Sequence, residues 1–219
     1  VSNSFSVYDK MIGKSMLNYP IEETAGKNGA VVFAWVNEYE LFGNVLKPSS
    51  IYVLEAATPL TSYDSASLLL PLATGGTLNK DDSMKLVQTV LCYDSSGNPL
   101  DIKLRDQPEK AYQWGYKGLY PTVEIANAKN TLTTIPTGIK EFFYEGFEEI
   151  DAANAVSGSS RSGKKYWNAN YTTSFTKPNN RAYVIQWWNL SGNKWIFNEQ
   201  PFTANVTLTG PVDDVRIFP

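Results

Sequence analysis

The sequence predicts an all-β protein, and three observations lead to that prediction. Short runs rich in Val, Ile, Tyr, Phe and Trp recur along the whole chain, for example at 50–55 and 182–188. The segment 100–105 alternates apolar and polar residues with a period of two. Turn-forming pairs separate the runs, and Asn28-Gly29 is the clearest of them because Asn-Gly favours tight hairpins. A series of antiparallel strands joined by short turns is therefore expected.

The first part of the chain is expected to be a sheet-rich segment. A short helical turn is expected at 9–16, before the first hairpin. A long excursion with little regular pairing is expected at 58–81, because Pro59, Pro71 and Gly75-Gly76 interrupt it. The strands expected here are 19–24, 30–39, 50–55, 84–93, 100–105 and 111–116, followed by a strand or short helix at 122–128.

The second part is expected to be a small β-sandwich. A linker at 127–137 ends with Pro136 and Gly138, which divides the chain into domains 1–135 and 136–219. A mobile loop is expected at 157–163, because Ser and Gly dominate it. The strands expected after the linker are 139–144, 166–175, 182–188, 194–198, 205–208 and 212–218.

Composition excludes several classes of protein. A chain of 219 residues buries about 70% of its unfolded surface, which is enough for a sizeable core. The net charge of −3 and the lack of a basic cluster argue against nucleic-acid binding. No apolar run approaches the roughly 20 residues that a membrane span needs, so no membrane insertion is expected. Because the chain begins Val1-Ser2 without Met, we expect a fragment or processed piece of a longer protein.

The absence of histidine bears on catalysis. It removes Ser–His and Cys–His pairs, imidazole metal ligands and the usual general base near neutral pH. The single cysteine, Cys92, forms no internal disulfide and is expected to be a small apolar strand residue. Carboxylate pairs among Glu145, Glu148, Glu149 and Asp151 remain available, but neighbouring acids mostly face solvent. We therefore expect a protein that is not an enzyme.

Two short segments bracket the last third of the chain, at 144–149 and 212–217. We expect the closing strand to fold back beside Phe147 and complete a two-layer unit. Calcium takes about six to eight oxygen ligands, usually with carboxylates from two chain segments. Glu148, Asp213 and Asp214 would then be candidate ligands. The alternative is that these carboxylates are solvated, or bonded to the backbone and to Arg216.

Aromatic residues cluster in the same region. In the strand 182–188, Trp187 and Trp188 point to opposite faces, so one belongs to the core and the other lies nearer the surface. Parity does not say which. Exposed Trp rings flanked by amide donors bind sugar rings, and core or edge packing is the other explanation. The candidate glycan-binding residues are Trp167, Gln186, Trp187, Trp188 and Trp195.

Three stretches carry a resemblance. They are Asn18-Tyr19-Pro20-Ile21-Glu22, Tyr93-Asp94 with Gly97-Asn98-Pro99, and Tyr112-Gln113-Trp114-Gly115-Tyr116 ahead of Tyr120-Pro121. Together they resemble the region bordering Rhs/YD repeats in very large bacterial surface proteins, where such strands stack into a coiled shell. The chain departs from that pattern, because one good Tyr-Asp…Gly-Asn unit cannot build a closed shell. None of these residues resembles the toxin domain that often ends Rhs proteins.

The bracketing segments and Ser162-Gly163-Lys164-Lys165-Tyr166 resemble the small jelly-roll, carbohydrate-binding-module-like domain inserted in the same proteins. In such domains a structural calcium is common, and Glu148 and Asp213 match its position. The resemblance implies a non-catalytic part of a secreted or cell-surface bacterial protein with a scaffold and adhesion or glycan-binding role. The implied partners are the rest of a parent polypeptide and either a glycan or secretion machinery. A purely structural or secretion-cargo segment, and a glycan-active enzyme, are the alternatives.

Overall fold

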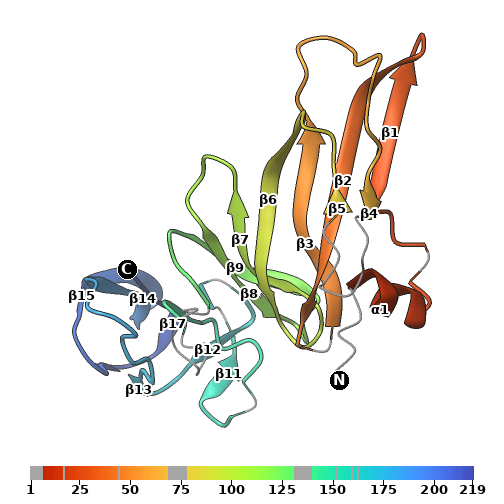
Figure 1. Ribbon diagram of the computed structural model, residues 1–219. Helices are drawn as coiled ribbons and strands as arrows, with labels where there is room; N and C mark the ends of the chain where they lie inside the picture. The colour runs from red at the N-terminus through yellow and green to blue at the C-terminus, as the bar shows by residue number, and fades with distance from the viewer. Residues whose placement is uncertain are drawn as a thin grey trace. The chain divides into compact units, whose positions relative to one another are not determined.

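The computed structural model describes residues 7–16, 18–43, 45–68, 78–130, 140–150, 152–158, 160–161 and 163–219. Of these described residues, 53% lie in strands and 4% in a helix, and the predicted all-β class is confirmed. The chain divides into two compact units, Val1–Pro108 and Glu109–Pro219 (Figure 1). The domain boundary expected at 135/136 lies among residues 131–139, outside the described part, and stays a prediction.

The first unit contains a helix and an antiparallel sheet (Figure 1). Its neighbouring strands, in spatial order, are β1 (Glu22–Lys27), β2 (Ala30–Phe42), β3 (Val45–Leu54), β6 (Met84–Tyr93) and β7 (Pro99–Leu104). The hairpin predicted at Asn28-Gly29 is confirmed, with φ of 55° and 78° at the two residues. Strand β2 continues beyond the predicted residue 39, because a bulge at Glu38/Tyr39 keeps it paired with β3.

The helix α1 (Val7–Gly13) covers part of this sheet. Its buried Tyr8 and Met11 pack in one cluster with Val36 and Tyr39 of β2 and with Met84 of β6. The expected excursion at 58–81 contains an isolated bridge between Leu60 and Val31 and the short pair β4 (Ser67–Leu68) and β5 (Leu78–Asn79). The first unit therefore has its own hydrophobic core.

The second unit begins with a hairpin of β8 (Lys110–Gly115) and β9 (Tyr120–Ala126). Composition predicts either a strand or a short helix at 122–128, and the register Lys110↔Ala126 to Gly115↔Tyr120 makes most of it a strand. The connecting turn contains Tyr116 and Lys117 with positive φ, followed by Gly118. Pairing with β8 thus decides the conformation that local composition did not.

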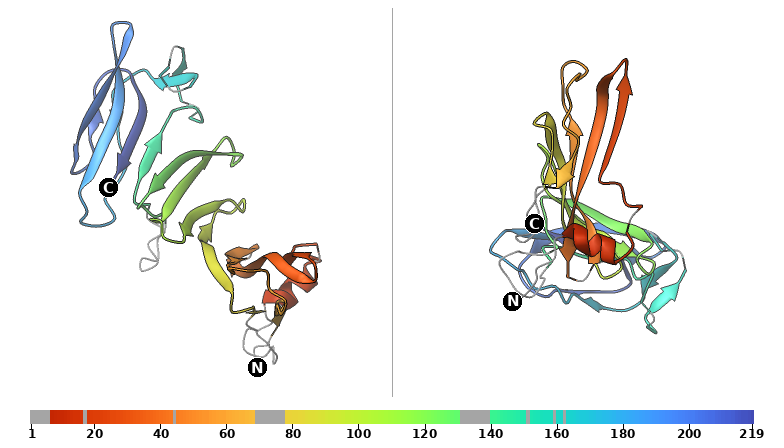
Figure 2. Two further views of the ribbon diagram at one scale, coloured as in Figure 1. Left: turned by 90° about the horizontal axis from the view of Figure 1, so that it is seen from above. Right: turned by 45° about the vertical axis from the view of Figure 1, so that its right-hand side comes forward.

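The main sheet of the second unit contains β10 (Phe143–Glu145), β11 (Ala155–Ser157), β12 (Lys165–Trp167), β14 (Tyr183–Ser191), β15 (Lys194–Phe202) and β17 (Val212–Phe218). Its path is β11-β12-β17-β14-β15, and β10 also pairs with β17. In Figure 2 the strands β14, β15 and β17, in blue, lie side by side. The predicted return of the closing strand is confirmed, because Tyr144 pairs with Arg216 and Glu145 with Val215.

The strand expected at 166–175 is wrong as a continuous element. The chain leaves β12 after Trp167 and forms a separate strand, β13 (Tyr171–Thr172), which pairs with β16 (Thr207–Leu208). Two bonds hold the break between them: Asn168 N donates to Asn154 O at 2.7 Å, and Trp167 Nε1 donates to Asn170 O at 3.1 Å. β13 thereby joins a second layer opposite the main sheet.

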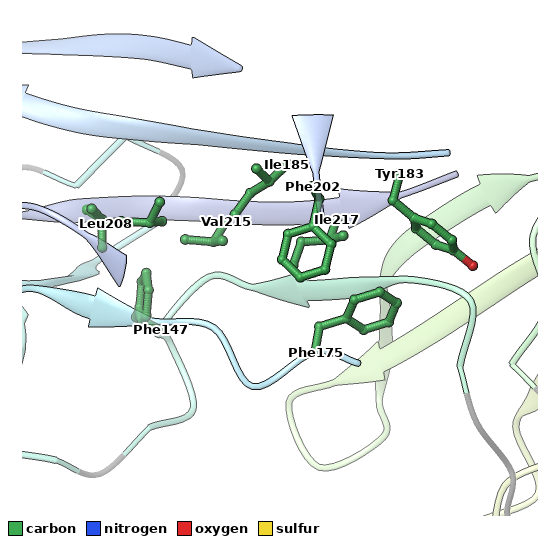
Figure 3. Packing of buried hydrophobic residues seen from close by; sticks show 9 residues of the cluster. Phe147, Phe175, Tyr183, Ile185, Phe202, Leu208, Val215 and Ile217 are labelled. Carbon is green, nitrogen blue, oxygen red and sulfur yellow. The ribbon is translucent and has the colours of Figure 1, made fainter. Parts of the chain in front are cut away.

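The core of the second unit lies between these two layers. Figure 3 shows Phe147 and Phe175 pointing toward side chains of the main sheet, among them Val215 and Ile217. This two-layer packing is what a β-sandwich requires. The jelly-roll topology stays a prediction. The buried members of the cluster are Phe147, Phe175, Tyr183, Ile185, Phe202, Leu208, Val212, Val215 and Ile217.

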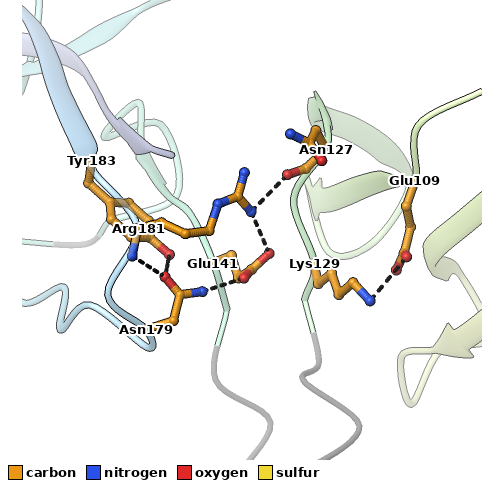
Figure 4. A network of polar contacts seen from close by, with 7 residues as sticks. All are labelled: Glu109, Asn127, Lys129, Glu141, Asn179, Arg181 and Tyr183. Carbon is orange, nitrogen blue, oxygen red and sulfur yellow. Dashed lines mark hydrogen bonds and ion pairs between the residues drawn. The ribbon is translucent and has the colours of Figure 1, made fainter.

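A polar network joins residues just after β9 to the sandwich (Figure 4). Glu141, whose side chain is almost fully buried, accepts hydrogen bonds from Asn179 Nδ2 at 2.5 Å and Arg181 Nη1 at 3.4 Å. Arg181 Nη1 also donates to Asn127 O at 3.1 Å. A small apolar cluster joins Ala111 of β8 to Ala128 and Phe142, which are the neighbours in sequence of Asn127 and Glu141. These contacts hold the β8–β9 hairpin against the sandwich.

We expect Ile217→Ala to lower the free energy of unfolding of the second unit by about 2–5 kcal/mol, because it leaves a cavity in this core. Ile217 is 0% exposed. The control is Ile196→Ala, because Ile196 is 49% exposed and should change stability by less than about 1 kcal/mol. Urea unfolding followed by tryptophan fluorescence measures both, since Trp167 and Trp187 pack against the cluster. Equal effects of the two variants would contradict this core.

Candidate functional site

The two faces of β14 separate its adjacent tryptophans. Tyr183, Ile185 and Trp187 face the core, and Trp187 Nε1 donates to Asn189 Oδ1 at 2.5 Å. Trp188 does not belong to the core cluster. It packs instead against Phe197 of β15, which is its cross-strand neighbour, with ring centroids 5.3 Å apart. The structure thus decides the question that parity left open: Trp187 is the core residue.

Four aromatic rings gather on the face of the main sheet that points away from the core, and we call Tyr166, Trp188, Trp195 and Phe197 the outer aromatic cluster. Trp195 lies two residues from Phe197 along β15, so the two share a face. Tyr166 of β12 contacts Trp195 edge-on, with ring centroids 5.5 Å apart. Phe197 is 46% exposed. The cluster therefore presents partly accessible aromatic rings.

An arginine completes this face. The guanidinium carbon of Arg161 lies 4.5 Å from the centroid of the Trp188 ring, a distance at which a cation is attracted to the ring. The backbone of the same residue is held in place, because Arg161 N donates to Asp213 Oδ2 at 2.6 Å. Asp213 is 0% exposed. A buried carboxylate thus positions the cation that covers Trp188.

The predicted ligand residues fall on both faces. Gln186, Trp188 and Trp195 lie on the outer face, and Gln186 Nε2 donates to Glu199 Oε2 at 2.6 Å. Trp187 and Trp167 lie on the core face. The Trp167 ring packs against Phe147 at a centroid distance of 5.8 Å. The residues brought together thus include three of the predicted set.

Sequence reasoning missed Tyr166, Phe197 and Arg161. The tight turn at Ser191-Gly192-Asn193 fixes the register of β14 with β15. Counting outward from that turn would have placed Phe197 opposite Trp188 on the same face. Nothing local indicates Tyr166 or Arg161. They reach the cluster because β12 joins β17 elsewhere in the sheet and because Asp213 binds the loop that carries Arg161.

The predicted metal ligands all have protein partners. Glu148 Oε1 accepts hydrogen bonds from Lys164 N at 2.6 Å and Lys165 N at 2.7 Å. Asp213 Oδ1 accepts one from Asp214 N at 2.8 Å. Asp214 forms a two-point ion pair with Arg216, with N–O distances of 2.8 and 2.7 Å. These are the backbone and arginine contacts that the sequence left as the alternative.

No group of three or more Asp, Glu or Cys side chains is arranged to hold a metal ion in the part of the chain that the structure describes. An ion at Asp213 would have to compete with the N–H of Arg161 for Oδ2, and an ion at Glu148 would compete with two N–H groups. The structural calcium at Glu148, Asp213 and Asp214 stays a prediction.

A second group of carboxylates lines a cavity of about 210 Å³ beside the end of β8. Burial raises the pKa of Glu145, and the negative charge of Glu149 raises it further. Glu145 Oε1 accepts the N–H of Phe147 at 2.7 Å, which acts in the opposite direction. Trp114 and Tyr116 also line this cavity. Glu145 is therefore a half-buried acid that caps the turn leading to Phe147.

No protein family, curated protein or solved structure matches this chain. Within the described residues, no helix is long and apolar enough to span a membrane. The fold and the site thus define an all-β protein with an exposed aromatic face.

We expect Gly163→Ala to loosen the loop that follows Arg161. A Cβ at Gly163 would clash with Glu148 Oε1, so the carboxylate must move and release the N–H groups of Lys164 and Lys165. Losing these bonds should lower the free energy of unfolding by about 1–3 kcal/mol. Gly13→Ala is the matched control, because the space around that position is open. Chemical denaturation compares the two, and an unchanged Gly163→Ala protein would contradict the clamp.

Glu145 provides a pH-dependent test. Burial raises the pKa of Glu145 in the folded protein, so the neutral carboxyl group favours folding and the ionised group opposes it. The stability that the neutral form provides is present at low pH and is lost as the pH rises through the raised pKa. Glu145→Gln removes that ionisation. The stability of the variant relative to the native protein should therefore increase between pH 3 and pH 7, which urea unfolding at each pH measures. A stability difference independent of pH would show that Glu145 ionises without cost.

Proposed function

We propose that this chain is a non-catalytic portion of a large secreted or cell-surface bacterial protein, in which the second unit binds glycans and the first unit serves as scaffold. The outer aromatic cluster carries the proposal. Its Trp188, Trp195 and Phe197 occupy one face of a two-stranded hairpin, and regular strand pairing fixes their spacing.

Glycan binding is supported by the chemistry of this face. The apolar faces of sugar rings stack on aromatic side chains, and polar groups at the margin bind the hydroxyls. Gln186 and Glu199 lie beside the rings on the same face and already share a hydrogen bond. Trp188 is held between Phe197 and Arg161, so little conformational entropy is lost when a ligand binds.

The non-catalytic assignment is supported by the contacts of two carboxylates that line the 210 Å³ cavity, because Glu145 and Glu148 both accept main-chain N–H groups. A glycosidase needs one carboxyl group as acid and a second as base or nucleophile. Glu145 is engaged by the N–H groups of its own turn. The chain also has no histidine to serve as an alternative base. A glycan-active enzyme is therefore the weaker hypothesis.

The scaffold role is supported by the Tyr-Asp…Gly-Asn turn between β6 and β7. Asp94 Oδ1 accepts N–H groups from Ser96 at 2.9 Å and Asn98 at 2.8 Å, and Gly97 has φ of 85°. Tyr93 Oη donates to Pro48 O at 2.6 Å, which ties the turn to β3. Each motif residue thus has a role in closing a hairpin and linking strands, as a stackable sheet unit requires.

A purely structural or secretion-cargo segment is the second candidate. The observation that favours it is the set of large apolar side chains exposed on the sheet of the first unit, which further polypeptide would bury. They are Val32, Phe33, Leu41, Leu86 and Leu91.

A glycan array probed with the full chain tests the proposal. For a glycan that binds, we expect Trp195→Ala and Phe197→Ala each to weaken affinity by about tenfold or more in calorimetric titration. Trp35→Ala is the control, because Trp35 is a half-buried tryptophan of the first unit that bonds to Glu23. An array without binding, or equal affinities for all three variants, would leave the structural candidate as the better explanation.

A further inference from the structure

The strand β9 has one free edge. It pairs with β8 through the register Lys110↔Ala126 to Gly115↔Tyr120, and no strand in the described part of the chain pairs with its other side. A free edge exposes main-chain N–H and C=O groups that can pair with another strand. Such an edge can bind another strand only if a groove wide enough for that strand lies beside it.

The pattern of hydrogen bonds between β8 and β9 shows which main-chain N–H and C=O groups of β9 are not bonded to β8. Asn127 N donates to Glu109 O at 2.6 Å, and in an antiparallel ladder the bonded pairs alternate with non-bonded pairs. The pairs Ala111/Ile125 and Gln113/Val123 are therefore the bonded ones. The N–H and C=O groups of Glu124 and Ala126 point away from β8. No described residue forms a main-chain hydrogen bond to them from that side.

A groove of about 410 Å³ runs along this edge. Five consecutive residues, 122–126, line it. Alternate residues of a strand face opposite sides, so consecutive lining residues mean that the groove follows the backbone edge. The opposite wall consists of Phe143, Tyr144, Gln186, Arg216 and Phe218.

Both walls of the groove are fixed in position. Glu141 and Arg181 hold Asn127, which directly follows β9. Gln113 Nε2 of β8 donates to Tyr144 O of β10 at 3.4 Å. The opening beside β9 is therefore present before any partner binds, which lowers the cost of binding.

The geometry points to this groove as the docking site for an extended peptide that adds to β9 as a further strand. The free groups of Glu124 and Ala126 repeat at the two-residue spacing of a strand, so a strand satisfies both. Phe143 and Phe218 offer contacts to apolar side chains of the peptide. This site contains none of the four rings of the outer aromatic cluster, shares Gln186 with the margin of that face, and does not depend on glycan binding.

Charge specifies the peptide further. The Arg216 side chain is 52% exposed, whereas its partner Asp214 is 4% exposed, so the groove presents the positive member of the pair. Glu124 also lines the groove, and it is the more exposed member of its ion pair with Lys110 (Nζ–Oε1 2.6 Å), so the groove presents one cationic and one anionic side chain. The peptide that fits best has alternating apolar residues and one acidic side chain opposite Arg216.

The test begins with a displayed library of random octapeptides selected against the full chain. A synthetic copy of an enriched peptide is then titrated by fluorescence polarisation. Ala126→Pro removes an outward N–H without removing a bond to β8, and should weaken binding about tenfold or more. Ala126→Ser keeps the N–H and should bind as the native chain does. An unselective library, or equal binding by Ala126→Pro, would overturn the proposal.

Amide hydrogen exchange keeps the test decisive if Ala126→Pro does not fold. In the native chain, the amides of Glu124 and Ala126 should exchange rapidly and become protected when the peptide is added. Replacing the acidic residue of the peptide by its amide should weaken binding, because the attraction to Arg216 is lost. Strand addition would be contradicted if the peptide slowed amide exchange only in the edge strand β15. It would also be contradicted if a glycan slowed the exchange of Glu124 and Ala126 and no peptide did.

Discussion

The second unit depends on the central position of its last strand. β17 is antiparallel to β14 along one edge and to β10 and β12 along the other, so the end of the chain joins segments that lie far apart in sequence. Without that strand, the β14–β15 hairpin would have no neighbour and the core would lose Val215 and Ile217. A hairpin alone is marginally stable in water, so these pairings make the sandwich possible.

An irregularity in the same strand organises the outer face. Between the pairs Gln186↔Arg216 and Trp188↔Asp213, β17 contains one residue more than β14, and Asp214 has φ of 52°. The bulge lets Asp214 pair with Arg216 while Asp213 binds the backbone of Arg161. Acidic residues that suggest a metal site in the sequence thus organise a loop and an arginine in the structure.

The two proposed binding sites use different chemistry. The outer aromatic cluster offers ring faces, which suit sugars, whereas the groove beside β9 offers unpaired main-chain groups, which suit a polypeptide. A glycan-binding surface and a strand-docking edge are compatible with one role. A module that contacts the outside through its rings has another edge for linkage to further polypeptide.

The sequence by itself determined the all-β class and the Asn28-Gly29 hairpin, because two-residue periodicity and turn chemistry are local. It also indicated the return of the closing strand, through the two segments that bracket the last third, but the register of that pairing is not local. Only the tertiary structure decided that Trp187 is buried, that Tyr166 and Arg161 join the outer cluster, and that β12 and β13 are separate strands. Parity gives opposite faces without saying which one meets a second layer. That depends on which distant segments pair, and no local pattern encodes it.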